Sequence, residues 1–408
     1  GCVFRSGTDT EVLLRLWERK QEACLERLNG MFAFALYDRR ENLLFAARDR
    51  FGVKPLYYAL TPDFLLFASE SKGILRSGLL RPEIDPAALV EYLTFQNLFG
   101  ARTLFEGVRM LEPGEYLRFR PASGDEPALA RHHKGFPAAN PALARGGEED
   151  VRELFESAVR RQLVSDVEVG AYLSGGMDSG SIVAVASRFI PRLMTFTGGF
   201  DLTNVNGIEQ GFDERAAAER LSYLMQTEHY AVVLHAGDMP AAMERIAWHM
   251  DDPRVGMCHQ NWYVAKLASR FVKVCLAGTG GDELFGGYPW RYLPVLEAED
   301  AVQAEDALFA SWQRLLPAGH LSGLLAPELR PGLDGVRRGF EEVMATAPAW
   351  DQGLSLRENL LCRVLHFEFK TFLHGLLVTE DRISMAHGLE TRVPFLDNDL
   401  ADVALCLP

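Results

Sequence analysis

Two glycine-rich turns, each placed directly after an apolar segment of strand length, constrain this chain more than any other feature. The first turn, 174–179, follows the apolar run 167–173, and the second, 278–287, follows the run 271–277. Residues with a helical pattern follow the first turn over 181–188, and another short apolar segment comes next. A strand, a turn, a helix and a strand form a βαβ unit, so the sequence predicts a parallel sheet.

The composition of the two turns indicates an anion-binding site that also holds a cation. Gly175 and Gly176 lack side chains, so backbone N–H groups can approach an anion beside a helix N-terminus. Asp178 conflicts with an anion site unless a magnesium ion bridges it to phosphate oxygens, and Asp282 is a second ligand of this kind. Together the turns predict a site for a nucleoside triphosphate with magnesium. The alternative is structural, because strand-to-helix turns often hold Gly and Ser, and Asp is a common N-cap.

Several functional classes are disfavoured by the sequence. Neither turn is a Walker A motif or a G-x-G-x-x-G in the right context, which argues against a dinucleotide oxidoreductase. Lys and Arg total 42 against 56 Asp and Glu, and the net charge of −14 argues against nucleic-acid binding. No apolar run approaches the roughly 20 residues of a membrane span. The six cysteines include no C-x-x-C pair, so we expect a reduced, cytoplasmic chain.

The first hundred residues predict a different architecture. A helix begins with Thr8 as its cap and Glu11 three residues later, as in a capping box. Apolar segments of strand length follow at 31–37, 43–47, 56–60 and 64–68. The short polar breaks between them predict antiparallel hairpins in a sheet that carries helices.

The composition changes after this first part, which we place at 1–120. Residues 121–147 are rich in Ala, Pro, Gly and Arg and lack periodicity, so we predict a linker. An amphipathic helix then opens the α/β part, 148–408. Its later portion, 297–386, consists mostly of helix-forming residues and predicts a helical cover.

These motifs resemble those of glutamine-dependent asparagine synthetases. The run Leu-Ser-Gly-Gly-Met-Asp-Ser at 173–179 resembles the pyrophosphatase loop of ATP-pyrophosphatases, and 278–287 and 384–397 extend the likeness to the synthetase domain. The segments 9–12, 28–34, 48–55 and 68–72 are similar to the back half of a class II glutaminase domain. The resemblance implies an α+β N-terminal-nucleophile-type sandwich, present in part, followed by an α/β parallel-sheet ATP-pyrophosphatase domain with a helical cover.

The resemblance also implies the reaction of an AMP-forming amidotransferase. The first domain would release ammonia from glutamine, and the second would activate a carboxylate, of aspartate or a related acid, as an acyl-adenylate. Ammonia would then cross an internal tunnel and displace AMP. The implied partners are small molecules (ATP, glutamine or ammonia, and a carboxylic acid) with Mg²⁺ as cofactor and neither nucleic acid nor membrane. A homodimer is compatible with this interpretation.

Roles for individual residues follow from the resemblance by position. The residues implied to bind ATP are Leu173, Ser174, Gly175, Gly176, Asp178, Ser179, Gly198, Ala277 and Gly278. Asp178 and Asp282 would share the metal ion, and with Thr279 they are the candidate catalytic residues. Asp9 would bind the amino group of glutamine, with a helix-cap role as the alternative. The acyl substrate would lie near Glu283, Glu390 and Arg392, the last two with a structural ion pair as the alternative.

Some positions depart from the family pattern. Thr279 stands where the family usually has Asp or Glu, a residue tied to forming the acyl-adenylate. Many relatives have a Lys just before Asp381, where this chain has Thr379 and Glu380. The nucleophilic Cys region of the glutaminase domain is absent from these 408 residues.

Three hypotheses therefore stay open. Thr279 favours a ligase like the β-lactam synthetases, in which an internal amine attacks the adenylate and glutamine is not used. Asp9 favours the glutamine-dependent amidotransferase. A non-catalytic homologue is the third, and the presence of Asp178 and Asp282 argues against it.

Overall fold

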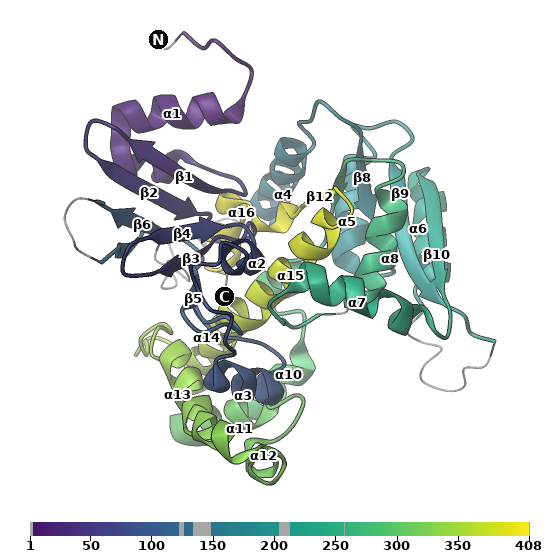
Figure 1. The fold of residues 1–408 in the computed structure, drawn as a ribbon. Helices are drawn as coiled ribbons and strands as arrows, with labels where there is room; N and C mark the ends of the chain where they lie inside the picture. The colour runs from purple at the N-terminus through teal and green to yellow at the C-terminus, as the bar shows by residue number, and fades with distance from the viewer. Residues whose placement is uncertain (1–2, 122–125, 134–147, 204–212, 257, 408) are drawn as a thin grey trace.

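The fold combines two antiparallel sheets, a parallel sheet and a helical region. A computed structural model describes residues 3–121, 126–133, 148–203, 213–256 and 258–407. The antiparallel sheets come first, the parallel sheet follows, and the helical region lies below both in the view of Figure 1. The last part of the chain, coloured yellow, returns to the centre between the antiparallel and parallel sheets.

Two antiparallel sheets make up the N-terminal part of the described chain. Their strand orders are β1–β2–β6–β7 and β4–β3–β5. The elements are α1 (Asp9–Lys20), the 3₁₀ turn η1 (Gln21–Arg27), β1 (Ala33–Asp38), β2 (Leu43–Arg48), β3 (Tyr57–Leu60), β4 (Leu65–Ala68), α2 (Ser71–Leu75), α3 (Pro86–Phe95), β5 (Val108–Met110), β6 (Glu115–Phe119) and β7 (Ala128–Arg131). The predicted hairpins are confirmed as β1–β2 and β3–β4. The predicted helix cap is also confirmed, since Thr8 Oγ1 accepts from the Glu11 N–H at 3.4 Å.

The two antiparallel sheets pack face to face. Their shared interior contains Ala46 from β2, Tyr58 from β3 and Leu117 from β6. Helix α1 covers the outer face of the four-stranded sheet, where the ring of Trp17 lies 4.6 Å from that of Phe45. Alternate strand residues therefore enter two different apolar layers, which explains the apolar runs in the sequence.

The predicted linker is wrong at one point, because it contains strand β7. This strand pairs antiparallel with β6, so the sheet continues beyond residue 120. An edge strand is held mainly by backbone hydrogen bonds on one side, and its side chains need no apolar alternation. The composition of 121–147 therefore did not reveal it. Residues 122–125 and 134–147 of the predicted linker lie outside the described part of the chain.

The α/β part is confirmed as a parallel sheet. Within the described residues, its strands run in the order β10–β9–β8–β11–β12, and each neighbouring pair is parallel. Its elements are α4 (Glu148–Gln162), β8 (Val169–Tyr172), α5 (Met177–Ala186), β9 (Met194–Phe200), α6 (Arg215–Met225), β10 (Glu228–Leu234), α7 (Asp238–Met250), α8 (Cys258–Ala268), β11 (Val274–Leu276) and α9 (Gly281–Phe285). Helices pack on both of its faces, which buries the strands.

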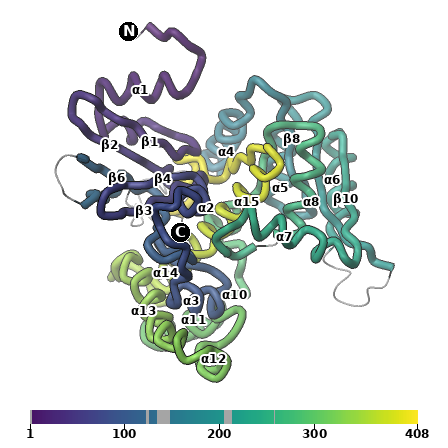
Figure 2. The backbone as a smooth tube through the Cα atoms, in the orientation of Figure 1, coloured from purple at the N-terminus to yellow at the C-terminus, as the bar shows by residue number. Residues whose placement is uncertain are grey.

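A helical region completes the fold, as predicted. Its elements are α10 (Pro289–Leu296), α11 (Ala301–Ser311), α12 (Ala318–Leu324), η3 (Pro327–Gly332), α13 (Leu333–Met344), α14 (Leu356–Glu368), the π-helical turn η4 (Phe369–Leu373), α15 (His374–Met385), β12 (Glu390–Arg392), η5 (Pro394–Leu396) and α16 (Asn398–Ala404). Helix α3 from the N-terminal part packs on α13 and η3. In Figure 2 it lies among the helices of this region. No helix in the described ranges is both long and apolar enough to span a bilayer.

The loop between β2 and β3 joins the N-terminal sheets to helices α15 and α16. Arg48 is fully buried and donates to the carbonyls of Leu111, at 2.6 Å, and Lys54, at 2.7 Å. Lys54 Nζ lies 2.7 Å from Asp381 Oδ1 on α15. The Lys54–Asp381 ion pair thus links this loop to α15.

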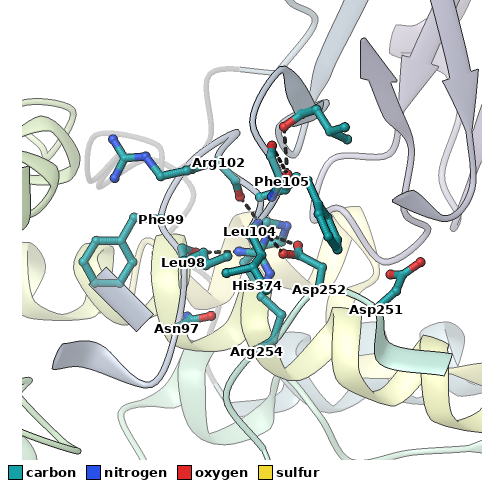
Figure 3. A network of polar contacts seen from close by, with 12 residues as sticks. Asn97, Leu98, Phe99, Arg102, Leu104, Phe105, Asp251, Asp252, Arg254 and His374 are labelled. Carbon is teal, nitrogen blue, oxygen red and sulfur yellow. Dashed lines mark hydrogen bonds and ion pairs between the residues drawn. The ribbon is translucent and has the colours of Figure 1, made fainter. Parts of the chain in front are cut away.

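A buried ion pair fastens the loop after α3 to the turn after α7. Arg254 Nη2 lies 2.7 Å from Asp252 Oδ2, and both side chains are 0% exposed. Arg254 also donates to the carbonyls of Leu98 and Arg102, and the Leu104 N–H donates to Asp252 Oδ1 (Figure 3). Each charge is therefore neutralised and hydrogen-bonded, as a buried ion pair requires.

We expect Asp252→Ala to lower the free energy of unfolding by about 3–5 kcal/mol, because it leaves the Arg254 charge buried without a partner. Urea unfolding followed by tryptophan fluorescence measures the change. The matched control is Asp306→Ala, which removes one side of the exposed pair Arg337–Asp306. The control should cost less than about 1 kcal/mol, and equal losses in the two variants would contradict this account.

Candidate functional site

A cavity of about 500 Å³ lies where β8 and β11 end. These strands are parallel neighbours, so the two glycine turns leave the sheet at the same edge. Residues of both turns line the cavity, and side chains of α15 close it on another side. Both turns therefore line one cavity, and the binding site predicted there stays a prediction.

The first turn is held in shape by its own serines. Ser174 N–H donates to Ser179 Oγ at 3.0 Å, and the two hydroxyl oxygens are 2.9 Å apart. The Gly176 N–H donates to Ser174 Oγ at 3.0 Å. Helix α5 begins at Met177, four residues before the predicted start, so Asp178 lies in its first turn. The predicted start of this helix was wrong, because the glycine pair and the polar residues after it carry no helical pattern although the helix begins directly after the glycines.

The second turn leads directly into α9. Gly280 caps this helix with φ +102°, a conformation that favours glycine. Glu283 Oε2 accepts from the Gly280 N–H at 3.0 Å, and its other oxygen accepts from Tyr288 at 2.7 Å. Neither Asp178 nor Asp282 is an N-cap, since those positions hold Gly176 and Gly280. The structural interpretation of the two aspartates is therefore wrong.

The two aspartates meet at the mouth of the turns. The Asp282 N–H donates to Asp178 Oδ2 at 3.1 Å, and both residues line the cavity. Partial burial, followed by the nearby Asp282 carboxylate, raises the pKa of Asp178 to about 6. A Cβ on Gly281 would lie 2.3 Å from Asp178 Oδ2, so this approach requires glycine at that position.

Every charged side chain among the described residues that line the cavity is acidic. The carboxylates are Asp178, Glu214, Asp282, Glu283 and Glu380, and the described lining includes neither Lys nor Arg. An anion would be repelled by this set unless a cation came with it. Carboxylate oxygens are preferred ligands of Mg²⁺, so the donors present fit a magnesium ion that brings phosphate oxygens of its own. In the described residues no three His, Cys, Asp or Glu side chains group as a metal site, which leaves the two aspartates as a partial ligand set.

One wall of the cavity is apolar. It is formed by Leu173, Phe196, Gly198, Val264 and Ala265. A Cβ on Gly198 would lie 2.7 Å from Val264, so any larger residue would disturb this wall. A flat apolar ring fits such a surface.

Most of the predicted site residues line this cavity. They are Leu173, Ser174, Gly176, Asp178, Ser179, Gly198, Ala277, Gly278, Thr279, Asp282 and Glu283. Gly175 is not among the lining residues. A Cβ there would lie 2.7 Å from Ala217 of α6, so packing accounts for this glycine.

Three predicted residues lie elsewhere. Asp9 lines a second cavity of about 970 Å³ between the N-terminal sheets and the outer side of α15. Its Oδ1 accepts from the Thr10 N–H at 2.7 Å. Glu390 and Arg392 form an ion pair at 2.6 Å on the edge strand β12, and Arg392 also donates to the Gln162 carbonyl. The ion pair fits the structural interpretation, and the two residues line cavities other than the one that contains Asp178 and Asp282.

Sequence reasoning missed Glu380 as a site residue. Thr279 Oγ1 donates to Glu380 Oε2 at 2.6 Å, and both residues line the cavity. Tyr288 and Ser384 also line it and were not predicted. The one signal in the sequence was the departure from the family pattern just before Asp381.

Comparisons with known proteins match both parts of the chain. The family model described as asparagine synthase matches residues 150–408, and a glutamine amidotransferase domain model matches residues 1–127. A putative asparagine synthetase (glutamine-hydrolyzing) of Mycobacterium tuberculosis is 35% identical over 100% of this chain and 66% of its own length. Asparagine synthetase 1 (glutamine-hydrolyzing) of Bacillus subtilis is 31% identical with the same coverage.

The chain therefore belongs to the asparagine synthase family. It carries the synthetase part of that family together with a stretch of glutamine amidotransferase domain. The chain spans 66% of the length of these curated relatives.

We expect Gly281→Ala to weaken the binding of ATP with magnesium by at least about tenfold. Its Cβ would displace the Asp178 carboxylate, and overpacking of this kind costs about 1–3 kcal/mol. Isothermal titration calorimetry measures the affinity. The control is Gly319→Ala on α12, where a Cβ meets nothing within 4 Å. An unchanged affinity in Gly281→Ala would show that the position of Asp178 does not matter for the nucleotide.

The raised pKa of Asp178 has a consequence for stability. The folded state binds a proton more tightly than the unfolded state, whose Asp titrates near 3.8, so stability falls as pH rises from about 4 to about 6. We therefore expect Asp178→Asn to be more stable than the parent protein at pH 7 without magnesium, with the difference vanishing below pH 4. Thermal unfolding at several pH values measures it. A variant that is less stable at pH 7 would contradict the electrostatic cause.

Proposed function

We propose that this chain is the larger part of an ATP-dependent, AMP-forming amidotransferase of the asparagine synthetase type. It would activate the carboxylate of aspartate or a related acid as an acyl-adenylate and convert it to an amide with ammonia from glutamine. The N-terminal sheets would form part of an N-terminal-nucleophile-type glutaminase domain, and the parallel sheet an ATP-pyrophosphatase domain. Support comes from the family membership and from the names of the two relatives.

One observation carries the proposal. Asp178 and Asp282 lie together at the ends of two parallel strands, in a cavity whose described lining has no basic side chain. Phosphate groups would enter such a site only with a divalent cation, because the carboxylates alone repel them. When bound, Mg²⁺ would neutralise charge on the pyrophosphate group as it departs.

The remaining residues of the cavity suit the other parts of ATP. The apolar wall around Gly198 would hold the adenine ring. Ser174 and Ser179 keep the first turn closed, and the first N–H groups of α5 point beyond its N-terminus, where a pyrophosphate would accept hydrogen bonds. These side chains bind and orient the nucleotide, and the chemical step follows from orientation.

Helix α15 lies between the two cavities. Glu380 and Ser384 line the cavity of the aspartates, whereas Asp381 and Arg382 line the one that contains Asp9. Glutamine would bind on the Asp9 side, and ammonia would pass α15 to reach the adenylate.

A second candidate, a ligase like the β-lactam synthetases, is favoured by Thr279 alone. In that reaction an amine of the substrate itself attacks the adenylate, and no ammonia is needed. Release of glutamate from glutamine by the intact protein separates the two, since only the amidotransferase produces it.

We expect pyrophosphate release that requires ATP, Mg²⁺ and a carboxylic acid, with L-aspartate as the first acid to test. Asp178→Ala should lower the rate at least about 10³-fold, because the phosphates would lose the cation that compensates the acidic cavity. Asp306→Ala on the exposed face of α11 is the control and should keep the parent rate.

The fold of Asp178→Ala is checked by circular dichroism and thermal unfolding. Unchanged pyrophosphate release in a folded Asp178→Ala would overturn the role of the aspartate pair. A parent protein that binds no nucleotide would instead support the non-catalytic homologue.

A further inference from the structure

We propose that Glu380 is the catalytic base of the amide-forming step, which takes a proton from the attacking ammonia nitrogen, and that Thr279 positions its carboxylate. This inference rests on the proposed function. It concerns a residue on α15, far in the sequence from both glycine turns, that neither turn pattern identified.

The first support is the place that the Glu380 carboxylate occupies. Thr279 is neutral and stands between the glycines of the second turn, where the family resemblance predicts an acid. Its hydroxyl donates to Glu380 Oε2 at 2.6 Å. A carboxylate is thus present beside this turn, although it comes from a helix 101 residues later.

The second support is the bonding of this carboxylate compared with its neighbours. Glu283 accepts from Gly280 and Tyr288, and Asp178 accepts from the Asp282 N–H. For Glu380 the described residues provide one hydrogen-bond donor, the Thr279 hydroxyl. Glu283 uses both of its oxygens within the turn, whereas Glu380, like Asp178, has accepting capacity left for a ligand.

The third support is electrostatic. Glu380 interacts electrostatically with five titratable groups, which are Asp381, Glu283, Lys54, Tyr172 and Cys275. Lys54 is the one cation among them, and it is paired with Asp381 at 2.7 Å. Burial therefore dominates and raises the pKa of Glu380 to about 7. A carboxylate with this pKa accepts a proton effectively near neutral pH.

The chemistry decides which step needs such a group. Adenylation joins a carboxylate oxygen to the α-phosphorus and expels pyrophosphate, and no proton is transferred. In the second step the ammonia lone pair forms a bond to the acyl carbon, and the C=O electron pair moves to oxygen. The nitrogen then carries three hydrogens and a positive charge. Glu380 takes one of these protons, the electron pair on oxygen re-forms the C=O bond, and the C–O bond to the phosphate breaks with its electron pair, which leaves the amide and AMP.

The position of α15 agrees with this step. Ammonia that comes from the Asp9 side must pass α15, and Glu380 is on the side of α15 that faces the aspartates. A carboxylate at that point also stabilises the developing ammonium before it loses its proton.

The test separates the two half-reactions in the intact protein. Exchange of labelled pyrophosphate into ATP, dependent on L-aspartate, reports adenylation. Formation of amide with ammonium chloride as the nitrogen source reports the second step and does not need the glutaminase domain. We expect Glu380→Gln to lower amide formation about 10²-fold more than it lowers exchange, which is the usual contribution of a general base.

A second variant keeps the test independent of folding defects. In Thr279→Glu/Glu380→Thr the carboxylate moves from α15 to the turn, and we expect amide formation at least tenfold above that of Glu380→Thr alone. Glu219→Gln, an exposed change on α6, is the control and should match the parent.

Each outcome decides something. Equal losses of exchange and amide formation in Glu380→Gln, or no loss of either, would overturn the role as base. No rescue in Thr279→Glu/Glu380→Thr would overturn the proposal that a carboxylate beside the second turn acts as the base. A parent protein that shows no exchange with L-aspartate or with any related acid tested would overturn the proposed function itself, and the inference would fail with it.

Discussion

The parallel pairing of β8 with β11 is the constraint on which the rest of the structure depends. Its register sets Gly170 opposite Cys275, and both strands end at the same edge of the sheet. A Cβ on Gly170 would lie 2.8 Å from the Phe196 ring, so the close packing of β8 on its neighbour requires glycine. Two turns that are about 100 residues apart in the chain thereby become adjacent walls of one cavity. A shift of either strand would separate Asp178 from Asp282 and remove the site.

The acidic cavity lowers the stability of the folded protein near neutral pH. Burial, with a smaller effect of neighbouring carboxylates, raises the pKa of Asp178 and of Glu380, so both ionised carboxylates are less stable in the folded apoprotein than they are in water. A cation that binds between the carboxylates would stabilise the folded protein, and a functional site often carries this kind of instability when it is empty.

The sequence predicted the elements with strong local signals and failed where the signal was weak or distant. The hairpins, the Thr8 cap and the parallel sheet follow from alternation, capping chemistry and the βαβ pattern. Strand β7 has no apolar alternation because it lies at an edge, and α5 begins earlier than its pattern indicated. Glu390 and Arg392 matched a motif, and only the structure showed that they form an ion pair on β12.

By itself the sequence determined which chemical groups are available: glycines for close approach, serines for hydrogen bonds and two aspartates for a cation. These groups follow one another within short segments, and local backbone rules are enough to interpret them. Only the tertiary structure decided that Glu380 joins them, because its contact with Thr279 links residues far apart in the chain. It also decided that the two cavities share α15 as their wall. Contacts of this kind depend on how a helix packs against a sheet, and no periodicity within the chain encodes them.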